Sequence, residues 1–158
     1  MGAAPRGMVR WRLFPHTNAM PSFLSLLVLD ERLRPLRFWT ALCLFLLIVA
    51  IGSIPGARAE IGNVASGIVL HSLAYSCVTF LLFTGSRGSR TQRAVKAVGA
   101  ALAMGALDEL VQGFLPYRVG AVSDWMVDAS AALLTAGLLW ALLPPPATAP
   151  ATASASQP

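Results

Sequence analysis

The sequence predicts an all-α fold, a polytopic transmembrane four-helix bundle. Hydrophobic residues make up 56% of the 158 residues, charged residues make up 12%, and the mean hydropathy is +0.65. Four apolar stretches follow one another, each close to the roughly 20 residues that cross a bilayer. Residues that disfavour helix follow three of these stretches: Pro55-Gly56 after the first, Pro116 after the third and Pro144 after the fourth.

The apolar stretches divide the chain into three parts. We expect spans at residues 38–54, 63–84, 94–115 and 124–143. Residues 1–37 then form a basic N-terminal segment, residues 38–143 form the transmembrane domain, and residues 144–158 form a disordered Ala/Pro-rich tail. A cleaved signal peptide is the alternative for the first span, because Ala57-Arg58-Ala59 has the small-x-small form of a cleavage site.

The distribution of basic residues predicts the orientation. Six arginines precede the first span, and four basic residues lie between the second span and the first turn of the third, whereas the other two loops hold one each, Arg58 and Arg118. The positive-inside rule therefore places both termini and the middle loop in the cytoplasm. We read the net charge of +5 as a topology signal and expect no nucleic-acid partner, because no aromatic or glycine pattern for base stacking accompanies it.

Polar side chains within the predicted spans converge near the outer ends of the helices. An ionisable group inside a span costs about 2.5–3.5 kcal/mol on insertion scales, so it needs a partner, a wet cavity or a function. Counting residues places these groups within about 12 Å of the outer end, except Tyr75, which lies one turn deeper than His71. They are His71 and Tyr75 on the second span, Asp108, Glu109 and Gln112 on the third, Asp124 and Asp128 on the fourth, and Arg118 in the outer turn.

Helical spacing assigns faces to the polar residues of the third span. Gln112 follows the two carboxylates by four and three residues, so it neighbours either one. Asp108 and Glu109 point about 100° apart, so only one of them faces the centre of the bundle squarely. We expect Glu109 in that place and Asp108 nearer the interface, with Arg118 pairing with a carboxylate of the third or fourth span.

Each candidate also has a purely structural interpretation. The first residues of a helix favour an acidic cap, cations anchor helix ends at the interface, and polar side chains form hydrogen bonds between packed helices. On this interpretation Asp124 caps the last helix, Arg118 is an interfacial anchor, and His71 and Tyr75 only join helices.

The stretch ALDELVQGFLPYRVGAVSDWMVDASAALL at 106–134, preceded by HSLAY at 71–75, resembles the VanZ-like membrane proteins. In that family a helix with Glu-x-x-Gln leads into Phe-x-Pro-x-Arg, then an Asp, and four residues later an Asn or Asp, while an earlier helix carries His-x-x-x-Tyr. The matching positions are His71, Tyr75, Glu109, Gln112, Phe114, Pro116, Arg118, Asp124 and Asp128. Two positions depart from the pattern: Gly67-Ile68 replaces an Asp-Lys pair, and alanine or serine replaces a glycine near 130–131.

The resemblance implies a multi-pass protein of the bacterial cytoplasmic membrane and a link to resistance to glycopeptides such as teicoplanin, but no known reaction. We expect a site for a lipid or lipid-linked envelope molecule near the outer leaflet. In that site Glu109 would be the main acceptor or base, Gln112 would orient it, His71 would carry a proton, and Arg118 would hold a phosphate or carboxylate.

Two other functions remain open: a small transporter or proton-coupled path, which would require a homo-oligomer, and a structural membrane subunit. Enzymatic activity is not favoured, because no nucleophile elbow, Ser-Lys pair or His-Glu-x-x-His motif is present. No cofactor is expected. No metal site is predicted either, because His71 and the carboxylates lack a tight ligand spacing.

Overall fold

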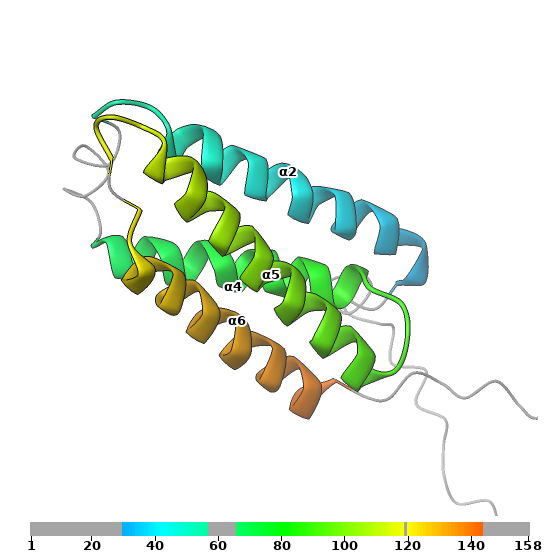
Figure 1. Cartoon of the computed structure of the whole chain (residues 1–158). Helices are drawn as coiled ribbons and strands as arrows, with labels where there is room; N and C mark the ends of the chain where they lie inside the picture. Colours follow the sequence, from blue (N-terminus) through cyan, green and yellow to red (C-terminus); the bar gives the residue numbers. More distant parts are fainter. Residues whose placement is uncertain (1–29, 57–65, 119, 144–158) are drawn as a thin grey trace, which may run out of the picture.

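The computed structural model describes residues 30–56, 66–118 and 120–143, most of which are helical (Figure 1). The elements are a 3-10 helix η1 (Glu31–Leu33) and the α-helices α2 (Arg34–Gly52), α4 (Gly67–Gly85), α5 (Arg90–Gly113) and α6 (Val122–Leu142). The all-α prediction is confirmed for these residues. The predicted cleavage site at 57–59, most of the basic N-terminal segment and the tail at 144–158 lie outside them.

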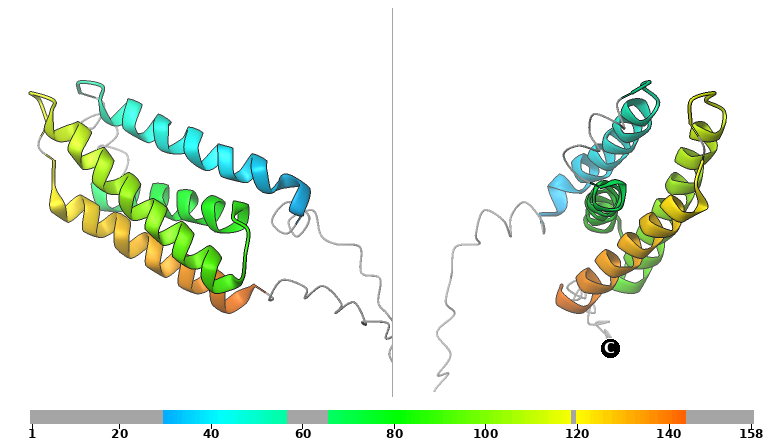
Figure 2. Two further views of the ribbon diagram at one scale, coloured as in Figure 1. Left: turned by 45° about the vertical axis from the view of Figure 1, so that its right-hand side comes forward. Right: turned by 90° about the vertical axis from the view of Figure 1, so that its left-hand side faces the viewer.

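The four long helices run alternately up and down (Figure 1). Helix α4 contacts all three of the others, and α5 packs chiefly on α6 and α4. The end-on view in Figure 2 shows α4 between α2 on one side and the α5–α6 pair on the other. Consequently α2 and α5 touch little. At the level of the polar residues described below they approach each other at Gly52, where an added Cβ would lie 3.6 Å from the Gln112 side chain.

Helix boundaries follow capping residues more closely than the edges of the apolar stretches. Helix α5 begins at Arg90, four residues before the predicted start at 94, because Ser89 and Gln92 form a capping box. The Ser89 hydroxyl accepts from the Gln92 N–H at 3.2 Å, and the Gln92 side chain accepts from the Ser89 N–H at 2.9 Å. Helix α2 likewise starts at Arg34 rather than 38, with Pro35 in its first turn.

Small residues form much of the interior and allow the helices to approach closely. Ala41 and Ala97 are fully buried in one cluster with Val78 and Phe83, and Ala132 is fully buried in a second cluster with Tyr75. On α5 the buried positions recur every three or four residues, as expected for one helix face. The buried positions of α5 are Arg93, Ala97, Ala101, Gly105, Asp108 and Gln112.

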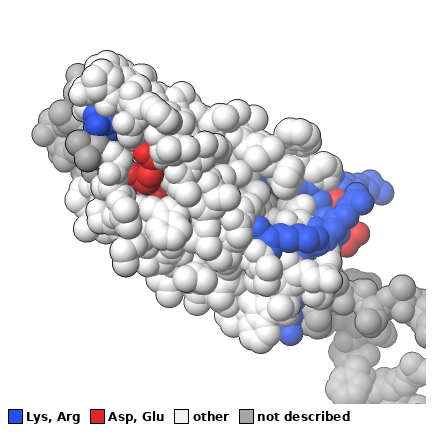
Figure 3. Space-filling model, viewed as in Figure 1, with Lys and Arg blue, Asp and Glu red and all other residues white. Residues whose placement is uncertain are grey.

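Basic residues gather mostly at the end of the bundle where α2 begins and α4 meets α5 (Figure 3). There Arg37 donates to the Thr84 carbonyl at 3.0 Å, and Arg93 donates to the Phe83 carbonyl at 2.8 Å. Arg90 donates in the same way to the Leu143 carbonyl at 3.0 Å. These arginines therefore satisfy carbonyls at the C-terminal ends of α4 and α6, where cations are stabilised by the helix dipole.

Within residues 30–56, 66–118 and 120–143, three helical segments are long and apolar enough to cross a membrane: Glu31–Gly52, Gly67–Gly85 and Val122–Leu142. Helix α5 is longer, at 24 residues, but its sequence contains five charged residues. The predicted fourth crossing therefore stays a prediction.

The close approach of α4 to α2 gives a test of the packing. A Cβ atom added to Gly85 would lie 2.8 Å from the backbone nitrogen of Phe38 and 3.1 Å from its Cα. Because backbone cannot move aside as a flexible side chain does, Gly85→Ala should lower the free energy of unfolding by about 1–3 kcal/mol. Thermal unfolding in detergent measures this. Gly137→Ala is the control, since nothing lies within 4 Å of its added Cβ; equal stability of the two variants would contradict the packing.

Candidate functional site

The predicted polar residues lie together at the end of the bundle opposite the basic one. Acidic side chains are visible there in Figure 3, away from most of the lysines and arginines. The predicted polar residues come from α4, α5 and α6 and from the turn between α5 and α6, as the sequence predicted.

A hydrogen bond between His71 and Asp128 joins α4 to α6. The His71 Nδ1 and Asp128 Oδ1 atoms are 2.9 Å apart, and the Asp128 side chain is only 1% exposed. On the other side of the imidazole, Nε2 lies 3.8 Å from Asp124 Oδ2. The His71 and Tyr75 rings are nearly parallel, with centroids 6.5 Å apart. The two aspartates and Tyr75 therefore determine the orientation of the imidazole.

Asp108, not Glu109, occupies the more buried position on α5. Asp108 is 1% exposed, whereas Glu109 is half-buried, so the expectation that Glu109 faces the bundle centre and Asp108 the interface is wrong. The reason is the helical stripe of small residues: Asp108 follows Ala101 and Gly105 by seven and three positions and shares their face. That face packs closely on α6, since a Cβ on Gly105 would lie 3.2 Å from Asp128 Oδ2.

Glu109 holds the beginning of α6 in place. Its Oε2 accepts a hydrogen bond from the backbone N–H of Ala121, the N-cap residue of α6, at 2.5 Å. Asp124 lies in the first turn of α6 and the N-cap is Ala121, so Asp124 complements the helix dipole without being the N-cap residue.

Arg118 pairs with an amide rather than with a carboxylate. Its guanidinium donates to Gln112 Oε1 at 2.7 Å, and no ion pair of Arg118 with an acid occurs among the described residues. The expected pairing with Glu109, Asp124 or Asp128 is therefore not formed. The neighbouring Tyr117 hydroxyl donates to the Ser53 carbonyl at 2.6 Å, which fastens this turn to the end of α2.

Several buried polar atoms at this end have no hydrogen-bond partner within the described part of the chain. They are the Tyr75 hydroxyl, both Asp108 carboxylate oxygens, Glu109 Oε1, Arg118 Nε and Asp128 Oδ2. Leaving a buried polar group unpaired costs about 1–3 kcal/mol, and more for a charged group. A cluster of such atoms from three helices and one turn is typical of a binding site rather than of a structural network.

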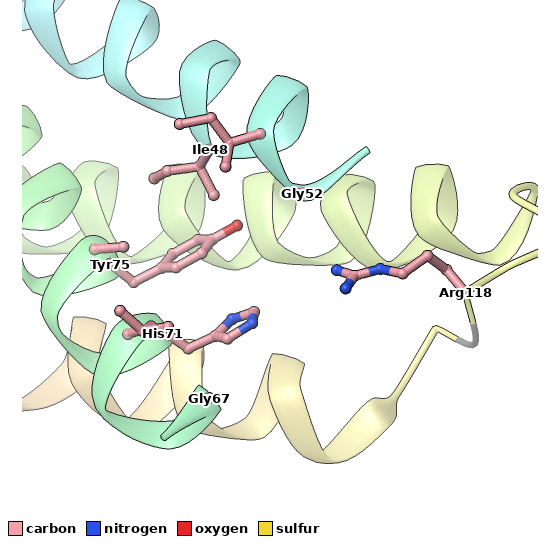
Figure 4. Close-up of a pocket in the computed structure, with 9 residues that line it drawn as sticks. Ile48, Gly52, Gly67, His71, Tyr75 and Arg118 are labelled. Atoms are coloured by element: carbon pink, nitrogen blue, oxygen red, sulfur yellow. The ribbon is translucent and has the colours of Figure 1, made fainter. Parts of the chain in front are cut away.

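A cleft of about 230 Å³ lies between α2 and α4 beside this cluster. Its wall is apolar and is formed by Ile48, Ile51, Gly52, Gly67, Leu70 and Ala74. Figure 4 shows the Tyr75 hydroxyl, the His71 imidazole and the Arg118 guanidinium directed toward the same space. The cleft therefore combines an apolar wall with a polar end, which suits an amphipathic ligand.

Three side chains of the cluster bring potential metal ligands together. One ligand atom each from His71, Glu109 and Asp128 lies within 4.8 Å of the other two.

No protein-family model, no curated protein and no solved structure that was compared with this chain matches it. The VanZ-like resemblance therefore remains a prediction that rests on the motif residues.

Sequence reasoning did not find the contribution of α2. Ile48, Ile51 and Gly52 line the cleft, and Ser53 receives the Tyr117 hydrogen bond. These residues carry no chemical signal that distinguishes them from other residues of an apolar span. Only the packing of α2 against α4 brings them to the site.

The unpaired carboxylate of Asp108 gives a test of the site. Asp108→Asn replaces a buried acid with a neutral group of the same shape, so the free energy of unfolding should stay the same or rise by up to about 2 kcal/mol. Asp128→Ala should instead lower it by about 1–3 kcal/mol, because His71 loses its partner. Unfolding in detergent measures both. A clear loss of stability in Asp108→Asn would show that the carboxylate has a structural role.

Proposed function

We propose that this protein is an integral membrane protein whose four helices cross the bilayer, with the basic end of the bundle in the cytoplasm. The outward faces of the helices support this placement. Leu46 of α2, Leu73 of α4, Leu110 of α5 and Leu134 of α6 are 63%, 64%, 56% and 69% exposed. Large apolar side chains on the outside of every helix are typical of a surface covered by lipid.

Helix α5 crosses with the others because its charged residues lie toward its two ends. Arg90, Arg93 and Lys96 occupy its first two turns, at the basic end of the bundle. Asp108 faces the interior and Glu109 binds the start of α6, so neither carboxylate needs to face lipid. The segment between them, residues 97–107, is entirely uncharged.

The protein binds a lipid or lipid-linked cell-envelope molecule with an anionic head, near the outer leaflet. The observation that carries this proposal is the cleft between α2 and α4, with its apolar wall and its polar end at Arg118, His71 and Tyr75. An acyl or polyprenyl chain lies against the wall. The phosphate or carboxylate of the head accepts hydrogen bonds from Arg118, whose Nε has no partner within the described residues.

The motif residues that resemble the VanZ-like family support the same proposal. Of these residues, His71, Tyr75 and Arg118 line the cleft, and Gln112 holds the Arg118 guanidinium. The resemblance adds a cellular role for such binding, namely reduced sensitivity to glycopeptides that act on envelope precursors. No reaction is proposed.

Lipid binding by the purified protein tests this function. Native mass spectrometry in mild detergent would compare phosphatidylglycerol and a polyprenyl phosphate, which carry the same head chemistry on different chains, with zwitterionic phosphatidylcholine. We expect one of the two anionic lipids to be retained and Arg118→Gln to weaken its binding roughly tenfold or more, since a charge-assisted hydrogen bond contributes about 1.5–3 kcal/mol.

Arg34→Gln is the matched control. Arg34 lies at the basic end and its ion pair with Glu31, 2.7 Å long, involves an exposed glutamate, so its loss should leave lipid binding unchanged. Equal retention of phosphatidylcholine, or equal binding by the Arg118 and Arg34 variants, would contradict the proposal.

A further inference from the structure

We infer that His71, Glu109 and Asp128 form a binding site for a divalent transition-metal ion such as Zn²⁺ or Mn²⁺. The residues come from three different helices, α4, α5 and α6, and each contributes one potential ligand atom within 4.8 Å of the other two. One imidazole and two carboxylates are ligands that both ions accept. The two carboxylates together balance the charge of the ion.

The geometry around His71 fits metal ligation through Nδ1. The distance of 2.9 Å between Nδ1 and Asp128 Oδ1 is close to the separation of two ligands on one ion, about 3 Å for bonds of 2.0–2.1 Å. The opposite nitrogen, Nε2, faces Asp124 Oδ2 at 3.8 Å. A carboxylate behind the second imidazole nitrogen is the usual outer partner of a metal-bound histidine, because it fixes the tautomer.

Unpaired carboxylate oxygens are the second observation that indicates a cation. Asp128 Oδ2 and Glu109 Oε1 are buried and have no hydrogen-bond partner among the described residues. Asp108 is 1% exposed, and neither of its carboxylate oxygens has a hydrogen-bond partner among these residues. It lies on the same face of α5 as Gly105, whose added Cβ would be 3.2 Å from Asp128 Oδ2. A bound cation would compensate this concentration of negative charge in an apolar bundle.

The ion would also affect what the neighbouring cleft can bind. His71 belongs both to the proposed ligand set and to the cleft wall, so the ion would lie beside the cleft. Three protein ligands leave coordination positions open, which an oxygen of an anionic head can occupy. Metal binding itself depends on side chains of the protein alone and does not require the lipid proposal to be correct.

Metal binding by the purified, lipid-free protein tests the inference. After treatment with a chelator, the protein in detergent would be equilibrated with Zn²⁺ or Mn²⁺, and the bound metal measured by elemental analysis and titration calorimetry. We expect about one ion per chain for the wild type, lost in Asp128→Asn and in Glu109→Gln. Affinity should fall as the pH is lowered, because the imidazole and the carboxylates must be deprotonated to bind.

Two further variants separate ligation from general effects of charge. Glu31→Gln removes an exposed acid at the other end of the bundle and should bind metal as the wild type does. Asp124→Asn, which removes only the carboxylate behind the imidazole, should weaken binding roughly 10–100-fold. X-ray absorption at the zinc edge of the wild type should show scattering from one imidazole, a result that does not depend on any variant folding.

Absence of stoichiometric binding by the folded wild type, or equal binding by Asp128→Asn and Glu31→Gln, would overturn the metal site. Lipid retention by the wild type is measured separately, in chelator-treated buffer that contains no free metal. Failure of the metal site and failure of the proposed lipid binding are therefore distinguished.

Discussion

The free-energy cost of burying ionised side chains in an apolar helix bundle determines where the charged residues of this chain lie. Basic residues are stabilised at one end by the carbonyls that terminate α4 and α6, as Arg37, Arg90 and Arg93 show. Most of the described acidic residues lie at the other end, where Asp128 contacts His71 and Glu109 accepts a hydrogen bond from the N-cap residue of α6. Between the two ends the interior consists mainly of alanine, valine, leucine and phenylalanine. This separation of charge gives the bundle one polar end that packing alone does not explain.

Much of the fold follows directly from the sequence. The length of the apolar stretches and the helix-breaking residues after three of them predicted the number and approximate positions of the helices. The predicted helix boundaries were less accurate. The Ser89–Gln92 capping box starts α5 at Arg90, within the basic segment that the sequence suggested was a loop. By length and composition, three of the described helices can cross a membrane. Helix α5 is not among them, because the charged residues on both sides of its apolar segment lower its mean hydropathy.

The sequence predicted which polar residues lie close together better than it predicted their orientation. A helical repeat places polar residues on a face, but which face turns inward depends on the neighbouring helices, and so Asp108 rather than Glu109 is buried. Contacts between helices have no local signature in the sequence. The proximity of His71 to Asp128, 57 residues apart, and the contribution of α2 to the cleft therefore emerge only from the packed structure. The sequence indicated His71, Glu109 and Asp128 as site residues, but only the packed structure brings one ligand atom of each within 4.8 Å of the others.

Single-cysteine labelling tests the transmembrane arrangement most directly. With Cys43 and Cys77 replaced by alanine, a cysteine would be introduced at Val122 or at Arg87, two exposed positions at opposite ends of the bundle. A membrane-impermeant maleimide should label position 122 in intact cells, and position 87 only after the membrane is opened. Labelling of both positions from the same side would contradict a bundle that crosses the bilayer with its acidic end outward.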